Sequence, residues 1–409
     1  MRGLYTFANR CYALGVRTVA LFGNPKAKLW VEGRNTFPAA GLDKDPWIWF
    51  HAASLGEFEQ GRPLIEAIKE SHPEVKICLS FFSPSGYEIR KDYPLADEVL
   101  YLPTDTPAHA RQWVRRHHYL AAFFIKYEFW FNYMKALADE AIPLYYISLI
   151  LKKDQYFFKP YGRWFLKQLG LVRHFFVQDQ TTLALLSETG YTNATLCGDT
   201  RFDRVAAIAK QAQPFPEIER FIGGRHCLIA GSTWPPDEKL LIPYLKRLPE
   251  DYCMIIAPHD ISDKHIQQIS ESLNDYQLYT KPDPQKKGKV LVLNTIGILS
   301  QLYQYARFVY IGGGFGVNIH NIQEPVTFGC PVVFGPKHTS FKEAVDLVRL
   351  GGAFTVSSQD ELDKIFDSLI QDERRHHEAS RICKDYLASQ LGATEAIMQG
   401  ITSIFSDGK

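Results

Sequence analysis

From about residue 46 onward, short apolar runs alternate with amphipathic stretches. Runs such as PWIWF (46–50), VKICLSFF (75–82) and YLAAFFI (119–125) are typical of strands buried on both faces of a parallel sheet. Between them, apolar residues recur at helical spacing, as in FEQGRPLIEAIKESH (58–72) and TPAHARQWVRRHH (106–118). This alternation predicts a doubly wound α/β fold, with helices on both faces of the sheet.

A polar, Pro- and Gly-bearing stretch, AKQAQPFPEIERFIGGR (209–225), interrupts the pattern, which then restarts with HCLIAGST (226–233). At 409 residues the chain is too long for one ordinary core. We therefore expect two doubly wound domains, 31–208 and 209–409, the second including the C-terminal helices. The simplest arrangement places a cleft between them.

The N-terminal segment GLYTFANRCYALGVRTVALFG (3–23) is apolar but contains Arg10 and Arg17. Crossing a bilayer takes about 20 uninterrupted apolar residues, and two central arginines make it costly. On a helical wheel, Arg2, Arg10 and Arg17 fall within roughly an 80° sector. Residues 1–30 are thus predicted to form a helix lying in a membrane interface, basic side toward phosphates. The alternative is a surface helix packed on its own domain.

Composition narrows the function classes. The formal net charge of +1 gives no global attraction to nucleic acid. The seven cysteines include no C-x-x-C pair, which argues against a zinc site or a disulfide framework and fits a reducing cytosol. No metal or other cofactor is therefore expected.

The first candidate catalytic group is Glu57, where the apolar run at 46–50 gives way to a helical stretch. Ser54 and Glu57 have the spacing of a capping box, in which each side chain satisfies a backbone N–H. Alternatively, a carboxylate at the end of a strand faces the crevice where α/β proteins bind ligands. Local sequence leaves both interpretations open.

Two motifs in the second half are candidates for binding a nucleotide. In IAGSTWPPDEKL (229–240), a strand passes through Ser232 into a helix start, where free N–H groups suit a phosphate. In GGGFGVNIHNIQEPVTFG (312–329), glycines are followed by a helix start, and Glu324 could accept hydrogen bonds from a ribose diol. Val317 replaces the third glycine of a dinucleotide fingerprint, and the Walker A G-K-[ST] is lacking, so neither pattern applies.

Taken in order, HAASLGEFEQGRPLIEAIK, KYEFWFN, GDTRFD, IIAPHD, NTIGIL and GGGFGVNIHNIQEPVTFGCPVVFGP resemble the motifs of the 3-deoxy-D-manno-octulosonic acid (Kdo) transferase family. This resemblance extends from the N-terminus to about residue 355. It implies a GT-B fold, two Rossmann-like domains with the active site between them. It also implies CMP-Kdo as donor, a lipid A precursor (lipid IVA) as acceptor, and action at the cytoplasmic face of the inner membrane in lipopolysaccharide biosynthesis.

The resemblance assigns site residues by position. It implies Glu57 as catalytic base, with Glu128 and Arg201 assisting the transition state. The donor-binding residues, including the Ser232 predicted above, are Ser232, Pro258, His259, Ile296, Gly297, Ile298, Asn321, Ile322, Gln323 and Glu324. The chain departs from the family pattern at several positions, namely Lys126, His259, Asp260, Ile298 and 317–319. These departures make the CMP contacts less secure than Glu57.

Elementary chemistry agrees with the implied reaction. A sugar activated as a nucleoside monophosphate carries its own leaving group, so one positioned carboxylate suffices to take the acceptor's proton. Single in-line attack inverts the anomeric carbon. Two stretches suit an acidic, acylated acceptor: RQWVRRHHY (111–119), better explained as a solvated helix face, and LKKDQYFFKPYGRWFLKQLG (151–170), where aromatics interleave with Lys and Arg.

Two other functions remain open at this point. One is a GT-B glycosyltransferase with a UDP-sugar donor, and the other is a non-catalytic nucleotide- or lipid-binding protein with the same fold. The sequence leaves undetermined the number of Kdo residues added, the acyl pattern of the acceptor and the oligomeric state. It also leaves undetermined whether the N-terminal helix spans the membrane or lies on it.

Overall fold

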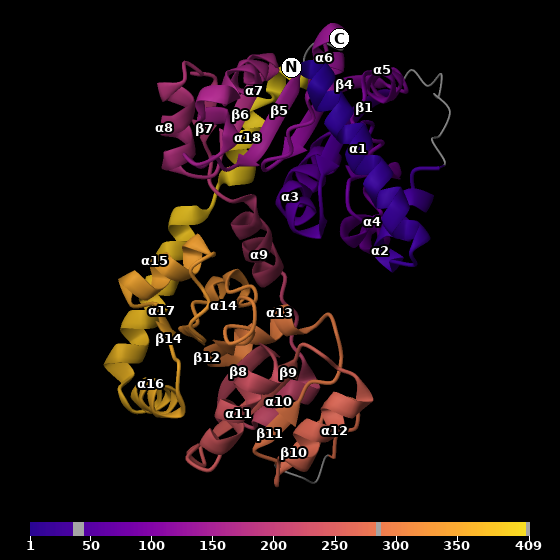
Figure 1. The fold of residues 1–409 in the computed structure, drawn as a ribbon. Coiled ribbons are helices and arrows are strands. Elements are labelled where there is room, and N and C mark those ends of the chain that lie inside the picture. Colours follow the sequence, from indigo (N-terminus) through magenta and orange to yellow (C-terminus); the bar gives the residue numbers. More distant parts are fainter. Residues whose placement is uncertain (36–44, 284–287, 406–409) are drawn as a thin grey trace. The chain divides into compact units, whose positions relative to one another are not determined.

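The computed structural model describes residues 1–35, 45–283 and 288–405. The chain divides into two compact units, Met1–Asp203 with Leu391–Lys409, and Arg204–Gln390 (Figure 1). Each unit is built on one seven-stranded sheet in which every paired strand is parallel. Two doubly wound α/β domains are therefore confirmed.

The sheet of the first unit has the strand order β3-β2-β1-β4-β5-β6-β7. Its strands are β1 (Pro46–Ala52), β2 (Lys76–Phe81), β3 (Glu98–Tyr101), β4 (His118–Ile125), β5 (Leu144–Leu149), β6 (His174–Val177) and β7 (Ala194–Leu196). Its helices are α1 (Arg2–Leu21), α2 (Pro25–Glu32), α3 (Leu55–Ser71), α4 (Pro84–Arg90), α5 (Pro107–Val114), α6 (Phe131–Asp139), α7 (Arg163–Gln168), α8 (Gln180–Glu188), α18 (Ala393–Gly400) and the start of α9 (Thr200–Lys210). Short 3₁₀ turns occur at Tyr156–Phe158, Pro160–Gly162, Leu169–Leu171 and Thr402–Phe405.

Strand β1 explains why the apolar runs lack the alternation of a half-exposed strand. Trp47 and Trp49 belong to one buried cluster, and Ile48 and Phe50 belong to another. Successive side chains of a strand point to opposite faces, so both faces of this sheet are covered.

The sheet of the second unit has the order β10-β11-β9-β8-β12-β13-β14. Its strands are β8 (His226–Thr233), β9 (Tyr252–Pro258), β10 (Tyr276–Leu278), β11 (Val290–Val292), β12 (Ala306–Ile311), β13 (Val332–Phe334) and β14 (Ala353–Thr355). Its helices are α10 (Pro216–Ile222), α11 (Pro235–Tyr244), α12 (Asp263–Glu271), α13 (Leu299–Leu302), α14 (Gln323–Thr327), α15 (Lys342–Leu350), α16 (Gln359–Gln371) and α17 (Glu373–Gln390). The short edge strands β10 and β14 were not predicted from the sequence, because Gln277 interrupts the apolar residues of β10 and Thr355 ends those of β14.

The domain boundaries differ from the prediction of 31–208 and 209–409. The first unit ends at Asp203, and the stretch 209–225 contains α10. The C-terminal residues from Leu391 return to the first unit, where Ile397 of the yellow helix α18 and Ile401, just after it, are buried in the core (Figure 1). The Asp203 carboxylate holds this return by accepting hydrogen bonds from the backbone N–H groups of Gly392 (2.7 Å) and Thr394 (2.6 Å).

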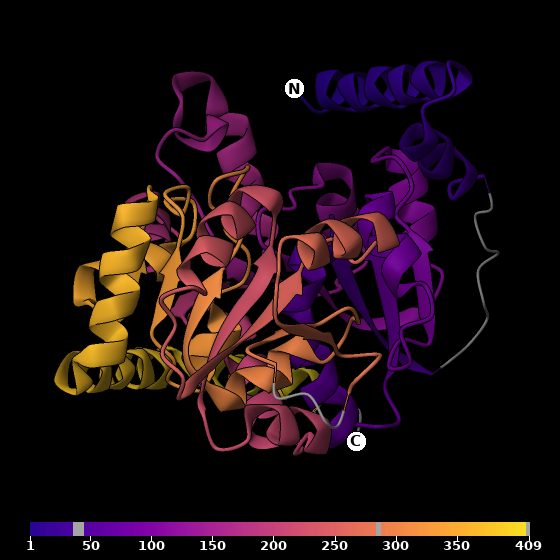
Figure 2. The same ribbon diagram turned by 90° about the horizontal axis from the view of Figure 1, so that it is seen from below.

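Helix α1 lies on the outside of its unit, as the indigo helix of Figure 2. Its inner face is anchored by the Tyr5 hydroxyl, 2.6 Å from Oδ2 of Asp105, and by Arg2, bonded to Gln168. Burial raises the pKa of Asp105 to about 6. The outer face is apolar, with Leu4, Phe7, Leu14, Leu21 and Phe22 between 63% and 87% exposed. Arg10 and Arg17 are also exposed. Within the described residues, no helix is both long and apolar enough to span a bilayer.

Candidate active site

Two predicted site carboxylates flank the point where the strand order of the first sheet reverses. Strands β1 and β4 are neighbours there, and Glu57 follows the end of β1 while Glu128 follows the end of β4. Ligands of open α/β sheets bind outside the carboxyl ends of the strands at such a switch point. The topology therefore brings Glu57 and Glu128 to the same edge.

Glu57 is 8% exposed, in the first turn of α3. Ser54, at the N-cap, accepts no bond from the helix; its hydroxyl instead donates to the Glu57 carboxylate. The capping box that the Ser54-x-x-Glu57 spacing predicts is thus not formed. The serine orients the carboxylate, which suits a residue that must accept a proton.

Glu128 is fixed from two sides. Its backbone carbonyl accepts from the Tyr146 hydroxyl at 2.8 Å, and its Oε2 accepts from the Trp130 indole N–H at 3.0 Å. Burial raises the pKa of Tyr127, and the next causes are the charges of Glu57 and Glu128. Both carboxylates therefore act on the Tyr127 phenol, which is 45% exposed.

Backbone strain concentrates at the carboxyl ends of the strands. Four non-glycine residues of the described chain have a positive φ, and three of them, Lys126, Ser148 and Ser232, end or immediately follow a central strand. A left-handed non-glycine residue costs about 1–3 kcal/mol and persists mainly at functional sites. Lys126 (φ 65°) is also the residue that replaces the first glutamate of the family's motif.

Arg201, the third predicted catalytic residue, is held by a carboxylate. Its Nε lies 3.1 and 3.0 Å from the two oxygens of Asp199, and Nη2 lies 2.5 Å from Oδ2. The adjacent Thr200 hydroxyl donates to the carbonyl of Gln60, which ties the start of α9 to the helix that carries Glu57. The guanidinium is thereby oriented without being buried, since its side chain is 29% exposed.

The second unit has its own switch point, between β8 and β12. Ser232, at φ 53°, lies near the end of β8. The start of helix α11, which follows Ser232, has fewer free N–H groups for an anion than the sequence predicts. The Asp237 carboxylate, 1% exposed, already accepts from the N–H groups of Trp234 and Gly313, both at 2.9 Å. A Cβ on Gly312 would lie 2.2 Å from the Ser232 carbonyl, so this glycine serves close backbone packing.

Three rings stack at this edge of the second sheet. His259 lies 4.5 Å from both Trp234 and His320, centroid to centroid, at 25° to each. The Trp234 indole N–H donates to Nε2 of His320 at 2.9 Å. Of the three, the sequence singled out only His259 as a donor ligand, because Trp234 and His320 are brought to it by tertiary structure alone.

The remaining predicted donor residues divide by exposure. Asn321 and Ile296 are exposed, and Gly297 and Ile298 lie beside them in the loop before α13. Asn321 caps α14 through the N–H of Gln323 and donates to Oε1 of Glu324 at 3.2 Å. The side chains of Pro258, Ile322 and Gln323 are buried, so these three residues could offer a ligand backbone groups only.

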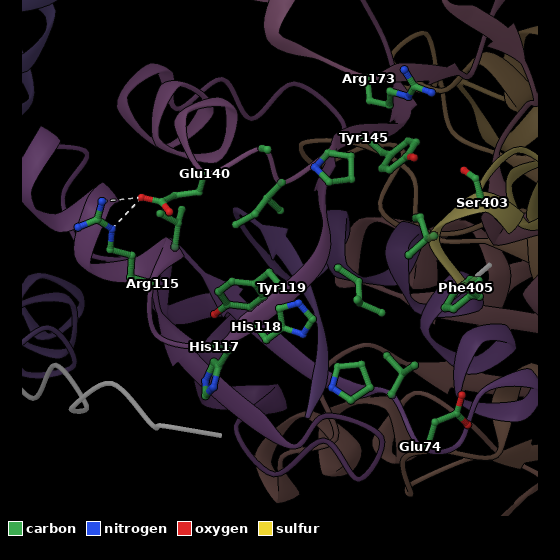
Figure 3. Close-up of a pocket in the computed structure, with 18 residues that line it drawn as sticks. Glu74, Arg115, His117, His118, Tyr119, Glu140, Tyr145, Arg173, Ser403 and Phe405 are labelled. Atoms are coloured by element: carbon green, nitrogen blue, oxygen red, sulfur yellow. Dashed lines mark hydrogen bonds and ion pairs between the residues drawn. The ribbon is translucent and has the colours of Figure 1, made fainter. Parts of the chain in front are cut away.

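A cavity of about 1040 Å³ opens at the other edge of the first sheet, where β1, β4, β5 and β6 begin (Figure 3). Arg115 and Glu140 form an ion pair at 2.7 Å on one side of it, and Ser403 and Phe405 line the other. Glu57 and Glu128 are not among its lining residues. This cavity is thus separate from the carboxylate edge.

Comparison with known proteins shows what the chain is similar to. Residues 23–204 match the family model for 3-deoxy-D-manno-octulosonic-acid transferase (kdotransferase). The 3-deoxy-D-manno-octulosonic acid transferase of Aquifex aeolicus (strain VF5) is 25% identical over 77% of this chain and 83% of its own length. The enzyme of the same name from Chlamydophila psittaci (strain ATCC VR-125 / 6BC) is 25% identical over 75% and 73%. The chain is thus similar to the Kdo transferases over most of its length.

The fold of this Kdo transferase relative is also that of solved GT-B-like structures. UDP-GlcNAc 2-epimerase from Neisseria meningitidis, bound to UDP-GlcNAc, superposes with a TM-score of 0.61 over 88% of this chain and 100% of its own, at 14% identity. Such a likeness shows the fold alone. The resemblance to the Kdo transferases that the sequence motifs indicate is confirmed.

Proposed function

We propose that this protein transfers Kdo from CMP-Kdo to a lipid A precursor, lipid IVA, with inversion at the anomeric carbon and without a metal. The observation that carries the proposal is the bond between Ser54 and Glu57. The local sequence predicts that both side chains bond to backbone N–H groups at the start of α3. In the structure, the Ser54 hydroxyl instead donates to the Glu57 carboxylate and orients it.

In the proposed reaction, Glu57 accepts the proton of the acceptor hydroxyl while the hydroxyl oxygen bonds to the anomeric carbon of Kdo. The bond from that carbon to the phosphate oxygen breaks, and CMP leaves with the electron pair. Arg201, held by Asp199, would meet developing negative charge. Glu128 would assist at the same edge.

The donor would bind to the second unit. The exposed Asn321 and the half-buried Glu324 offer an amide and a carboxylate to a ribose, and the ring stack of Trp234, His259 and His320 offers a polar aromatic surface. Because the first two residues of α11 are prolines, and the Asp237 carboxylate already accepts from the N–H groups of Trp234 and Gly313, we place the phosphate away from that helix start.

The acceptor would bind to the first unit. In the stretch 151–170, Tyr156 and Tyr161 are 37% and 69% exposed, and Lys152, Lys153 and Arg163 are exposed around them. A hollow of about 370 Å³ is lined there by Phe157, Phe158, Lys159, Pro160, Arg163, Leu166 and Thr189. Apolar walls with cationic groups suit an acyl chain beside a phosphate.

We further propose that the apolar outer face of α1 lies in the interface of the inner membrane, on the cytoplasmic side. The exposed Leu4, Phe7 and Leu14 would enter the acyl boundary, and Arg10 and Arg17 would contact lipid phosphates. The helix would lie on the membrane rather than span it.

Incubation of the full chain with CMP-Kdo and tetraacylated lipid A precursor, followed by mass spectrometry, tests the proposal. We expect one or more added Kdo masses and release of CMP, unaffected by EDTA. Absence of any Kdo product with well-folded protein and membrane-mimicking detergent would contradict it. The competing UDP-sugar donor is tested by thermal shift, where CMP should stabilise the protein and UDP should not.

A further inference from the structure

Behind Glu128, a chain of buried polar side chains leads into the core of the first unit. The Trp130 indole N–H lies between two acceptors, Oε2 of Glu128 at 3.0 Å and Nε2 of His51 at 2.8 Å. His51 is fully buried at the end of β1, and its Nε2 lies 3.7 Å from the same Glu128 oxygen. None of the sequence motifs assigns His51 a role.

The hydrogen bonds around His51 have only one consistent direction. Ser80 Oγ accepts from the Trp49 indole N–H at 2.7 Å and lies within 3.3 Å of the Phe50 carbonyl, to which its own hydrogen can go. The Trp130 indole can only donate, so Nε2 of His51, 2.8 Å away, accepts its hydrogen. The neutral ring then carries its own hydrogen on Nδ1, which donates to Ser80 Oγ at 2.9 Å.

The indole cannot easily turn away from this arrangement. Phe82 lies against Trp130 with ring centroids 4.7 Å apart. Phe82 is in turn held by Arg34, whose Nη2 donates to the Phe82 carbonyl at 2.7 Å. Burial lowers the pKa of Arg34 to about 9, and the guanidinium lies over Trp30, Phe82 and Tyr101.

We propose that His51 is a positioning residue for Glu128, acting through the indole N–H of Trp130; this rests on the proposed function of Glu128 in Kdo transfer. By accepting from the Trp130 indole N–H, His51 holds that N–H in the orientation in which it also donates to Oε2 of Glu128. A carboxylate that is already oriented by a hydrogen bond does not have to reorient when the transition state forms beside it. Residue 51 needs an acceptor at the Nε2 position, so histidine and glutamine satisfy it and asparagine does not.

Two substitutions at residue 51 test this assignment. In His51→Asn, the side-chain amide can reproduce the Nδ1 donor toward Ser80 but leaves Trp130 without its acceptor. In His51→Gln, the side-chain oxygen can reach the Nε2 position. We expect His51→Asn to lower kcat about 10- to 100-fold, because the indole N–H of Trp130 is no longer held toward the charged Glu128 carboxylate. The KM for CMP-Kdo should be unchanged. His51→Gln should recover much of that loss.

The double variant separates positioning from general damage to the fold. If His51 acts through Glu128, adding His51→Asn to Glu128→Gln should cause no further loss of kcat. Trp130→Phe should resemble His51→Asn, whereas Trp47→Phe, a buried tryptophan at the other end of β1, should leave kcat within about twofold. Wild-type kcat in His51→Asn, or a full multiplicative loss in the double variant, would overturn the inference.

The indole N–H of Trp130 gives a readout independent of the substrate. In ¹⁵N-tryptophan-labelled protein, the signal missing from Trp130→Phe identifies it. We expect both His51→Asn and Glu128→Gln to shift this signal and to speed its hydrogen exchange. An unchanged signal in His51→Asn would overturn the inference even if Kdo transfer occurs. A protein that shows the shifts but transfers no Kdo would instead disprove the proposed function while supporting the arrangement.

Discussion

Trp234 donates its indole N–H to Nε2 of His320 at 2.9 Å, with the two ring planes only 10° apart. Because Nε2 accepts this bond, His320 must be neutral and carry its hydrogen on Nδ1. Burial lowers the pKa of His320, and the nearby His259 lowers it further while Asp237 opposes them. The ring stack is thus a feature of the neutral histidine.

The first prediction concerns pH. A folded-state pKa below the ordinary 6.5 means that the contribution of His320 to stability is complete above about pH 6.5. It is lost as the pH falls through the lowered pKa, because protonation of Nε2 removes the acceptor for Trp234. We expect CMP affinity, measured by calorimetry, to weaken as the pH falls over the same range.

His320→Asn is the control for this pH dependence. It removes the titrating ring, so its CMP affinity should start lower and vary less between pH 7.5 and 5. If the CMP affinities of the wild type and His320→Asn change in parallel with pH, then protonation of His320 does not control binding of the donor nucleotide.

The second prediction concerns Glu57. Replacing it with glutamine keeps the shape but removes the base, so transfer should fall about 10²- to 10⁴-fold while CMP affinity and melting temperature change little. Product formation by mass spectrometry measures the loss. Glu66→Gln, on the same helix and paired only with Arg62, is the matched control and should transfer normally. A Glu57→Gln protein with wild-type kcat would exclude Glu57 as the base.

The third prediction concerns the outer face of α1. Phe7 and Leu14 are 63% and 65% exposed, so changing both to glutamate should leave the melting temperature unchanged. Binding to vesicles that contain phosphatidylglycerol, measured by co-sedimentation, should weaken at least about tenfold, because two apolar side chains no longer enter the acyl region.

Ile89→Glu is the matched control for α1. This residue is 58% exposed on α4 of the same unit, so it adds to another apolar surface position the charge that each of the two α1 substitutions adds. If Ile89→Glu weakens vesicle binding as much as the α1 variant does, the effect is net charge and not the face of α1.

The fourth prediction concerns the C-terminal return. Ile397 is fully buried in the core of the first unit, so Ile397→Ala should lower the free energy of unfolding of that unit by about 2–5 kcal/mol. Urea denaturation measures this loss. Gln399→Ala, exposed on the same helix, should change it by less than about 0.5 kcal/mol. Equal, small effects of both substitutions would mean that α18 is not part of that core.

What the sequence determined by itself is local. Apolar runs and helical spacing are repeated many times along the chain, and they predicted the strand–helix alternation, two sheets and the position of Glu57 after β1. The motifs found in order were enough to indicate the family. The edge strands β10 and β14 were not predicted because polar residues, Gln277 and Thr355, leave them without an apolar run.

Tertiary structure alone decided which side chains meet. His51 and Trp130 are 79 positions apart, and they bond because β1 lies beside β4 in the sheet, an order that no local period specifies. The return of α18 to the first unit has the same origin, since Asp203 and Gly392 are 189 positions apart. Even the adjacent Ser54 and Glu57 followed the fold rather than their spacing, because a capping box and a hydroxyl–carboxylate bond use the same two side chains. Which of the two forms depends on what surrounds the carboxylate.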